Sequence, residues 1–189
     1  MLAAELLPLL ARIPEARRRP LPLFARVGDG LTEAPEHARA VVMNPPYGRV
    51  RLDETERSRW NRYLYGHANL YSLFLAAGLE SLDDDGVLAA LVPTSFLAGR
   101  YFASLRAELA RQAPLREVTF VEERDGVFAG VLQETCLAVF ARCRSRRTAI
   151  ASANGRIAEV AKVASPRGNR PWILPRRSDD AHVAAAAAA

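Results

Sequence analysis

The chain has 189 residues, of which half are hydrophobic and a quarter are charged, and this composition is typical of one globular domain with a sizeable core. No apolar run is long enough to span a membrane and no signal peptide is recognisable, so a cytoplasmic protein is expected. The net charge of +5 and the pI of about 9.8 suit a polyanionic partner. Cys136 and Cys143 lack metal-site spacing, and Cys136 is expected to be a buried, reduced thiol.

The first elements precede a glycine–aspartate turn. Residues 2–12 are rich in Ala and Leu and predict a helix, and residues 21–27 predict a short strand. That strand ends at Gly28-Asp29-Gly30, where an Asp-Gly turn is expected. The turn places one carboxylate just beyond the end of a strand.

The next feature is a strand that stops abruptly. Residues 41–43 predict the end of a buried strand, which is cut off by Asn44-Pro45-Pro46-Tyr47. Proline holds the residue before it extended, so Asn44 is fixed at the strand tip. Because the prolines have no N–H, the turn offers mainly acceptors, to which Asn44 adds an amide and Tyr47 a flat ring. Ligands of open α/β sheets bind at such strand ends.

This turn suits an amino group attached to a flat ring. The side-chain oxygen of Asn44 and the carbonyl of Pro45 can each accept one N–H of the amine, which draws the nitrogen towards a tetrahedral shape. Tyr47 can stack on the ring. A methyl donor in line with the nitrogen lone pair then allows methyl transfer by positioning and electrostatics.

The remaining pattern alternates helices and strands. Residues 49–66 predict a mobile loop with a short helix over the site, a candidate lid, and Asn69 is expected to cap a helix that runs through residue 82. Asp83-Asp84-Asp85-Gly86 predicts a solvated turn, since consecutive acids do not point at one metal centre. The following elements are a strand at 87–92, a helix to about 112, and strands at 116–122 and 136–142, which are expected to be antiparallel.

Asn44-Pro45-Pro46-Tyr47 resembles the catalytic motif of S-adenosylmethionine-dependent amino methyltransferases, above all N6-adenine DNA methyltransferases of restriction–modification systems. The resemblance covers roughly residues 21–145 and includes Asn-Leu-Tyr-x-x-Phe at 69–74. It implies an α/β fold with a Rossmann-like sheet, helices on both faces and a terminal antiparallel strand pair. It also implies S-adenosylmethionine as cofactor and a target adenine that is flipped out of duplex DNA.

The resemblance carries over to individual residues. The implied catalytic residues are Asn44, Pro45, Pro46, Tyr47 and Phe128, and the implied cofactor-binding residues are Asp29, Gly30, Asn44 and Pro46. Asp29 matches an acidic residue that contacts the cofactor's adenine, and Phe128 matches an aromatic residue that closes on the flipped base. The alternatives are a plain Asp-Gly turn for Asp29 and a plain core contact for Phe128.

One departure from the family concerns the cofactor loop. The first glycine is Gly28, and Gly28-Asp29-Gly30 does not continue into a glycine-rich loop. The sequence therefore predicts a methyltransferase sheet that is incomplete at its N-terminus, in a fragment, a split-gene product or a degraded copy. It leaves open whether this chain alone is active, and it makes a missing N-terminal segment or a complementary subunit an expected partner.

Three regions are expected along the chain. Residues 1–145 would form a partial catalytic domain, and residues 146–183, basic and interrupted by proline, would form a linker and the start of a target-recognition region. Residues 184–189 are a low-complexity tail that is set aside as an artefact.

Methylation of adenine N6 in duplex DNA is the first functional hypothesis. The same turn also occurs in enzymes that methylate guanine N2 in RNA or a glutamine of a release factor, and these remain alternatives. A non-catalytic DNA-binding fragment or subunit is the third, and no metal is expected.

Overall fold

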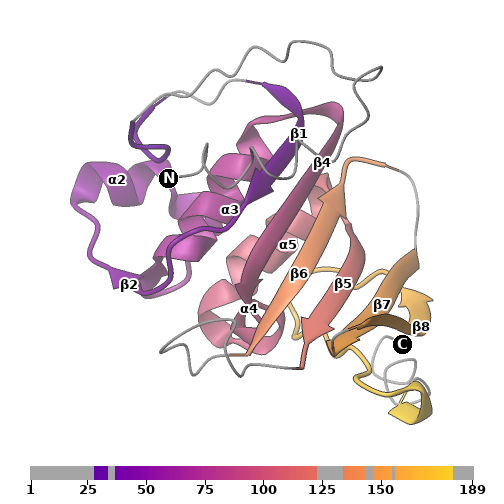
Figure 1. Ribbon diagram of the computed structural model, residues 1–189. Helices are drawn as coiled ribbons and strands as arrows, with labels where there is room; N and C mark the ends of the chain where they lie inside the picture. Colours follow the sequence, from indigo (N-terminus) through magenta and orange to yellow (C-terminus); the bar gives the residue numbers. More distant parts are fainter. Residues whose placement is uncertain (1–27, 34–36, 123–133, 144–146, 155, 181–189) are drawn as a thin grey trace, which may run out of the picture.

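The structure is a computed structural model that describes residues 28–33, 37–122, 134–143, 147–154 and 156–180. A six-stranded mixed sheet dominates these residues, with strand order β1-β4-β6-β5-β7-β8 (Figure 1). In that order the strands are β1 (Ala38–Met43), β4 (Leu82–Pro93), β6 (Thr135–Ala141), β5 (Leu115–Val121), β7 (Arg147–Asn154) and β8 (Arg156–Ala164). The α/β fold expected from the sequence is confirmed.

The pairing directions place the ends of β1 and β4 together. These two strands are parallel, with Met43 opposite Ala90, so their carboxyl ends lie at the same end of the sheet. β4–β6 and β5–β6 are antiparallel, as expected for the last strand pair, and β7 lies parallel to β5. A separate two-stranded sheet joins β2 (Arg49–Val50) to β3 (Ala68–Asn69).

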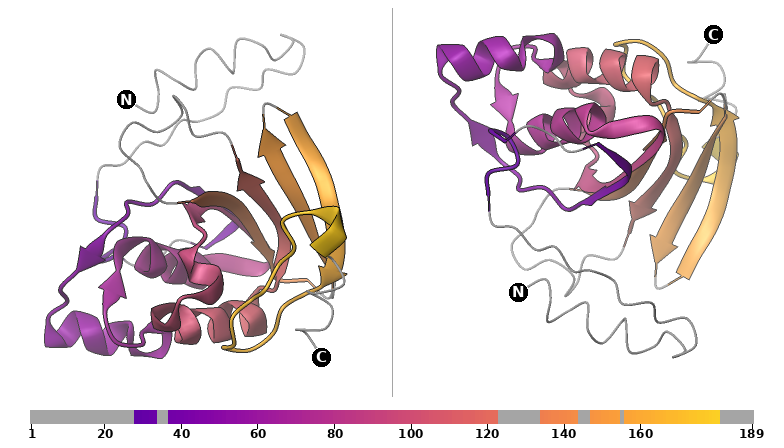
Figure 2. Two further views of the ribbon diagram at one scale, coloured as in Figure 1. Left: turned by 90° about the horizontal axis from the view of Figure 1, so that it is seen from below. Right: turned by 90° about the horizontal axis from the view of Figure 1, so that it is seen from above.

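The helices that the structure describes cover one face of the large sheet, as both views in Figure 2 show. They are α2 (Glu54–Arg59), η2 (Asn61–Tyr63), α3 (Leu70–Glu80), α4 (Ser95–Ala98), η3 (Arg100–Phe102) and α5 (Ala103–Gln112), and a short helix η4 (Ser178–Asp180) follows the sheet. The core lies between this layer and the strands, where Leu79, Leu109, Leu88 and Phe140 are fully buried. Burial of this apolar layer supplies most of the driving force for folding.

The opposite face of the sheet is apolar and open in the described part of the chain. Val42 is 83% exposed, and Val87 and Leu137 on the neighbouring strands are also exposed. Their strand neighbours Val41 and Leu88 point instead towards α3, since both lie close to Gly78. Helices on both faces were expected, but the described helices cover only one.

The described residues within 146–183 differ from the linker that the sequence predicted. β7 and β8 extend the sheet, and Trp172 packs against Phe96 in the core with 3% exposure. The buried guanidinium of Arg106 donates hydrogen bonds to the carbonyls of Phe96, Gly99, Asn169 and Arg170. This C-terminal segment is therefore part of the catalytic-type domain, because it completes that domain's core.

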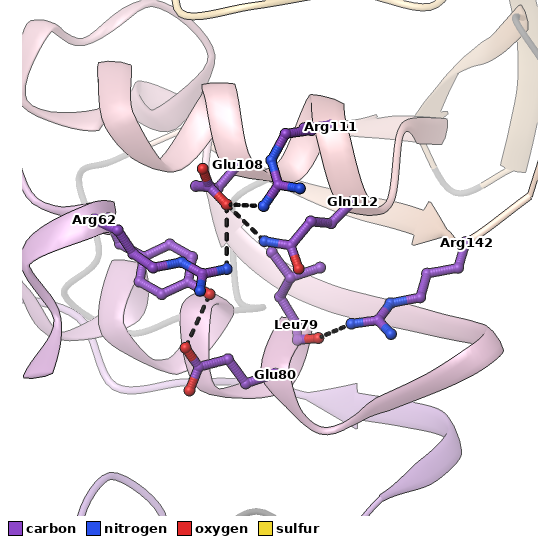
Figure 3. A network of polar contacts seen from close by, with 8 residues as sticks. Arg62, Leu79, Glu80, Glu108, Arg111, Gln112 and Arg142 are labelled. Carbon is purple, nitrogen blue, oxygen red and sulfur yellow. Dashed lines mark hydrogen bonds and ion pairs between the residues drawn. The ribbon is translucent and has the colours of Figure 1, made fainter.

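Residues 49–66 contain the short helix that the sequence predicted, α2, but the residues that follow it are packed into the core. Trp60 and Tyr63 are buried, and the Tyr63 hydroxyl donates a 3.0 Å hydrogen bond to Glu80. Nearby, Glu108 accepts from Arg62, Arg111 and Gln112 (Figure 3). Within the segment, η2 packs on α3 and α5. Asp83–Asp85 fall within β4, at an irregularity where the pairing with β1 jumps from Leu82 to Val87, and Asp84 and Asp85 are exposed as expected for a solvated turn.

Candidate functional site

The turn after β1 presents an unpaired amide at the sheet edge. β1 ends at Met43, Asn44 is exposed, and Pro45 is buried beneath it. The Asn44 side chain forms no hydrogen bond with any residue that the structure describes. Its carbonyl and amino groups are therefore available to a ligand, which is what the sequence predicts for this residue.

Tyr47 is held in one orientation by two contacts. Its hydroxyl donates to the carbonyl of Leu91 at 3.2 Å, and its ring meets Tyr71 edge-on at 6.2 Å and 80°. Tyr71 in turn stacks on Phe102 at 5.1 Å, and its hydroxyl lies 2.9 Å from the Ser95 hydroxyl. Burial raises the pKa of Tyr47, so its hydroxyl remains a neutral donor at physiological pH. The plane of the Tyr47 ring is consequently set before any ligand binds.

The other end of the turn is joined to the start of α3. Gly48 has φ of +124°, a conformation that favours glycine, and its carbonyl accepts from the Leu70 amide at 2.8 Å. Immediately after it, Arg49 pairs with Asn69 across β2 and β3. Asn69 occupies the N-cap position of α3, as expected, although its side chain makes no capping hydrogen bond. These contacts hold residues 44–48 between β1 and α3.

Asp29 and Gly30 form the second part of the site. The Asp29 carboxylate accepts from the Leu31 amide at 3.0 Å with one oxygen, and the Asp29 carbonyl accepts from the amides of Thr32 and Glu33. Asp29 is exposed, so its second carboxylate oxygen remains able to accept from an amino group. A Cβ added at Gly30 would lie 3.5 Å from the ring of Phe74 in α3.

Helix α3 brings these two parts together. Tyr71 contacts Tyr47 of the turn, and Phe74, one helical turn further on, lies beside Gly30. Tyr47 and Gly30 therefore both lie against α3, at residues that are three positions apart on that helix. Phe128, the predicted cover of the base, lies outside the described residues.

The supporting residues are ones that the sequence pattern did not single out. Tyr71 was read only as part of Asn-Leu-Tyr-x-x-Phe, and Phe102 and the Leu91 carbonyl carried no signal. Their role depends on which side chains meet across elements, and a single sequence does not show this. Among the described residues, no three or more His, Cys, Asp or Glu side chains are grouped to hold a metal ion, and no helix is long and apolar enough to cross a membrane.

The parallel β1–β4 pair, the antiparallel β5–β6 pair and the helix layer on one face together define a mixed α/β domain, with the Asn-Pro-Pro-Tyr turn at the end of β1. The chain matches the Eco57I restriction-modification methylase family over residues 33–128, just over half of its length, and it belongs to that family.

Two type II methyltransferases are similar in sequence. M.BsuBI of Bacillus subtilis is 30% identical over 98 residues, which cover 51% of this chain and 20% of that protein. M.PstI of Providencia stuartii is 30% identical over 106 residues, covering 55% and 21% respectively. The matched region thus spans about a fifth of the length of these relatives.

Solved structures show the same fold. A class I S-adenosylmethionine-dependent methyltransferase from Listeria monocytogenes superposes with a TM-score of 0.55 at 17% identity, over 66% of this chain and 39% of that one. The type IIG restriction endonuclease BpuSI gives a TM-score of 0.54 at 21% identity, over 67% and 16%. These likenesses establish the architecture of the sheet and its helices.

Proposed function

We propose that this chain carries the catalytic turn of a DNA methyltransferase that transfers a methyl group from S-adenosylmethionine to the N6 amine of adenine in duplex DNA. The observation that carries the proposal is the exposed Asn44 amide, which has no hydrogen bond to a described residue and lies three residues before Tyr47, whose ring is fixed. Membership of the Eco57I restriction-modification methylase family supports a role in a restriction–modification system.

The residues of the turn would act by holding the target amine. The Asn44 side-chain oxygen and the Pro45 carbonyl each accept one N–H, so the nitrogen lone pair is directed away from the ring plane. Tyr47 stacks on the extruded base and offsets part of the few kcal/mol lost when the base leaves the duplex. Since the Tyr47 ring is already held in place, it needs no reorientation when the base binds.

The described residues fit one end of the cofactor. S-adenosylmethionine, when bound, supplies the methyl group. The open carboxylate oxygen of Asp29 suits the amino group of the cofactor's adenine, and Phe74 beside Gly30 offers an apolar surface for the ring. Pro46, which is exposed next to Asn44, lies at the border between cofactor and base in this arrangement.

The remaining cofactor contacts would come from a further segment or a complementary subunit. Among described strands β1 pairs only with β4, which leaves its other edge open, and the apolar sheet face around Val42 is uncovered. An added strand would pair with such an open edge, and an added helix would cover such an apolar face. Titration of S-adenosylmethionine by calorimetry tests this point, because micromolar binding by this chain alone would make a further segment unnecessary.

The decisive test is methylation of unmethylated genomic DNA with labelled S-adenosylmethionine, followed by mass spectrometry of the nucleosides. The unaltered protein should produce N6-methyladenine, and Asn44→Ala should reduce the rate of methylation by about 100-fold or more. Asn154→Ala, an exposed change at the end of β7, is the matched control and should keep full activity. Normal methylation by Asn44→Ala would refute the proposed role of the turn.

The same assay separates the alternatives. Transfer to guanine of structured RNA or to glutamine of a protein, with none to DNA, would replace the proposed substrate. The unaltered protein could instead bind DNA in a salt-dependent way without binding the cofactor or transferring a methyl group. That result would indicate a non-catalytic DNA-binding module.

A further inference from the structure

A cluster of exposed aromatic and basic side chains lies beside the candidate site. We name it the Arg100 patch, and it consists of Tyr65, His67, Arg100 and Tyr101. Arg100 donates a 2.9 Å hydrogen bond to the Tyr65 hydroxyl, and its guanidinium carbon lies 5.4 Å from the centre of the Tyr65 ring. The His67 and Tyr101 rings meet at 5.5 Å. Tyr65 and Tyr101 are 43% and 45% exposed, so large aromatic surfaces face the solvent here.

The patch adjoins an open pocket of about 440 Å³ between residues 62–65 and α5. Arg62, Ser104 and Asn169 line this pocket together with Tyr65 and Arg100. Its one acidic residue, Glu108, is already engaged by Arg62 and Arg111. Arg100 forms no ion pair with a carboxylate of the described residues, and most of its N–H groups remain available to an anion.

Ring contacts connect the patch to the catalytic turn. Tyr47 of the turn meets Tyr71 at 6.2 Å, and Tyr71 stacks at 5.1 Å on Phe102, the last residue of η3, which also contains Arg100 and Tyr101. On the other side, Tyr65 and His67 lead directly into β3, which pairs with β2 after the turn. The Arg100 patch and Asn44 therefore lie at the same end of the sheet, the end at which β1 and β4 stop.

The geometry points to the sugar–phosphate backbone of the substrate DNA as the ligand of the Arg100 patch, with Arg100 on a phosphate close to the target adenine. This inference rests on the proposed function. Each DNA strand carries one phosphate per about 3.4 Å of rise, so a duplex with its base at Asn44 must place phosphates beside the turn. Arg100 supplies a phosphate contact, and the exposed tyrosines supply contacts to sugar and phosphate oxygens.

The experiment measures binding of a fluorescent 30-base-pair duplex by anisotropy between about 50 and 200 mM salt. Four variants are compared with the unaltered chain: Arg100→Ala, Arg100→Lys, Tyr101→Ala and Arg156→Ala. The last removes an exposed arginine of β8, at the opposite edge of the sheet, and is the matched control for lost charge. Circular dichroism confirms that each variant is folded.

Arg100→Ala should weaken binding about five- to tenfold and reduce the slope of log affinity against log salt by about one. Arg100→Lys should retain the slope because it retains the charge, and Tyr101→Ala should weaken binding without changing the slope. A lost fold would not produce this pattern.

Two results would overturn the inference, and they are distinguishable. If Arg100→Ala behaves like Arg156→Ala while the unaltered chain binds DNA, the patch does not contact the backbone and the proposed function is unaffected. If the unaltered chain shows no salt-dependent DNA binding, both the patch assignment and the proposed DNA substrate for this chain fail.

Discussion

The phenolic hydroxyl of Tyr47 donates a 3.2 Å hydrogen bond to the backbone carbonyl of Leu91, one position beyond the last paired residues of β1 and β4. The β1 ladder stops at Met43 opposite Ala90, because Pro45 and Pro46 cannot supply ladder donors. The Tyr47 side chain provides a donor next to two prolines whose backbone has none. Tyr47 thus both bonds the turn to β4 and carries the ring predicted to stack on the base.

We expect Tyr47→Phe and Tyr47→Ala to separate these two roles. Tyr47→Phe removes only the hydroxyl and should lower the free energy of unfolding by about 1 kcal/mol, with the ring contact to Tyr71 retained. Tyr47→Ala also removes the stacking surface and should strongly reduce methylation. Urea unfolding and the methylation assay measure the two effects, and equal activity of both variants would argue against stacking by Tyr47.

Arg106 should be indispensable for stability. Its side chain is 1% exposed and donates to four backbone carbonyls in α4, Gly99 and residues 169–170. Arg106→Leu leaves these acceptors unsatisfied and should cost about 3 kcal/mol or more. Amide hydrogen exchange should also accelerate at Trp172, whose amide donates to Leu97.

The matched control for that change is Arg111→Leu on the same helix, where the guanidinium is 63% exposed. It should change stability by about 0.5 kcal/mol or less. A similar cost for both variants would mean that the buried hydrogen bonds of Arg106 contribute nothing specific.

Glu108 makes part of the stability dependent on pH. The hydrogen bond from Arg111, followed by that from Gln112, lowers the pKa of Glu108 below its usual value of 4.5. Its contribution is therefore fully present above pH 4.5 and is lost as the pH falls through the lower pKa of the folded state. Glu108→Gln should cost less than about 1 kcal/mol at pH 7, since solvent screens the pair.

A double-mutant cycle of Glu108→Gln and Arg111→Gln, measured by urea unfolding at pH 7 and pH 3, checks this dependence. The coupling between the two residues should be weaker at pH 3 than at pH 7. Equal coupling at the two pH values would contradict an ionic origin.

The two cysteines should differ in reactivity. Cys136 is fully buried near the start of β6, and burial raises its pKa to about 12, whereas Cys143 is exposed. Because the thiolate is the reactive form, a disulfide reagent at pH 8 should modify Cys143 rapidly and Cys136 only after denaturation. Cys143→Ser should abolish the rapid phase, and a rapid phase that remains would show that Cys136 is accessible.

The strand ends and the turn were predictable because they depend on local chemistry. Prolines after residues 41–43 stop a strand in any context, and the actual end of β1 at Met43 agrees with this. Burial of two other stretches is not predictable in this way. The polar stretch at 49–66 and the proline-containing described residues within 147–180 resemble loops, yet Trp60, Tyr63 and Trp172 are buried because they meet a helix layer formed elsewhere in the chain.

The sequence by itself determined the acceptor-rich turn at Asn44–Tyr47, since proline geometry, the missing N–H groups and the side-chain chemistry are properties of consecutive residues. Only the tertiary structure decided which groups orient that turn and which surface adjoins it. Leu91 and Tyr71 contact Tyr47 from two separate elements, and Phe102 stacks on Tyr71 from a third. Arg100 meets Tyr65 across 35 positions. Such pairings arise from the packing of helices on a sheet, which is a property of the whole fold.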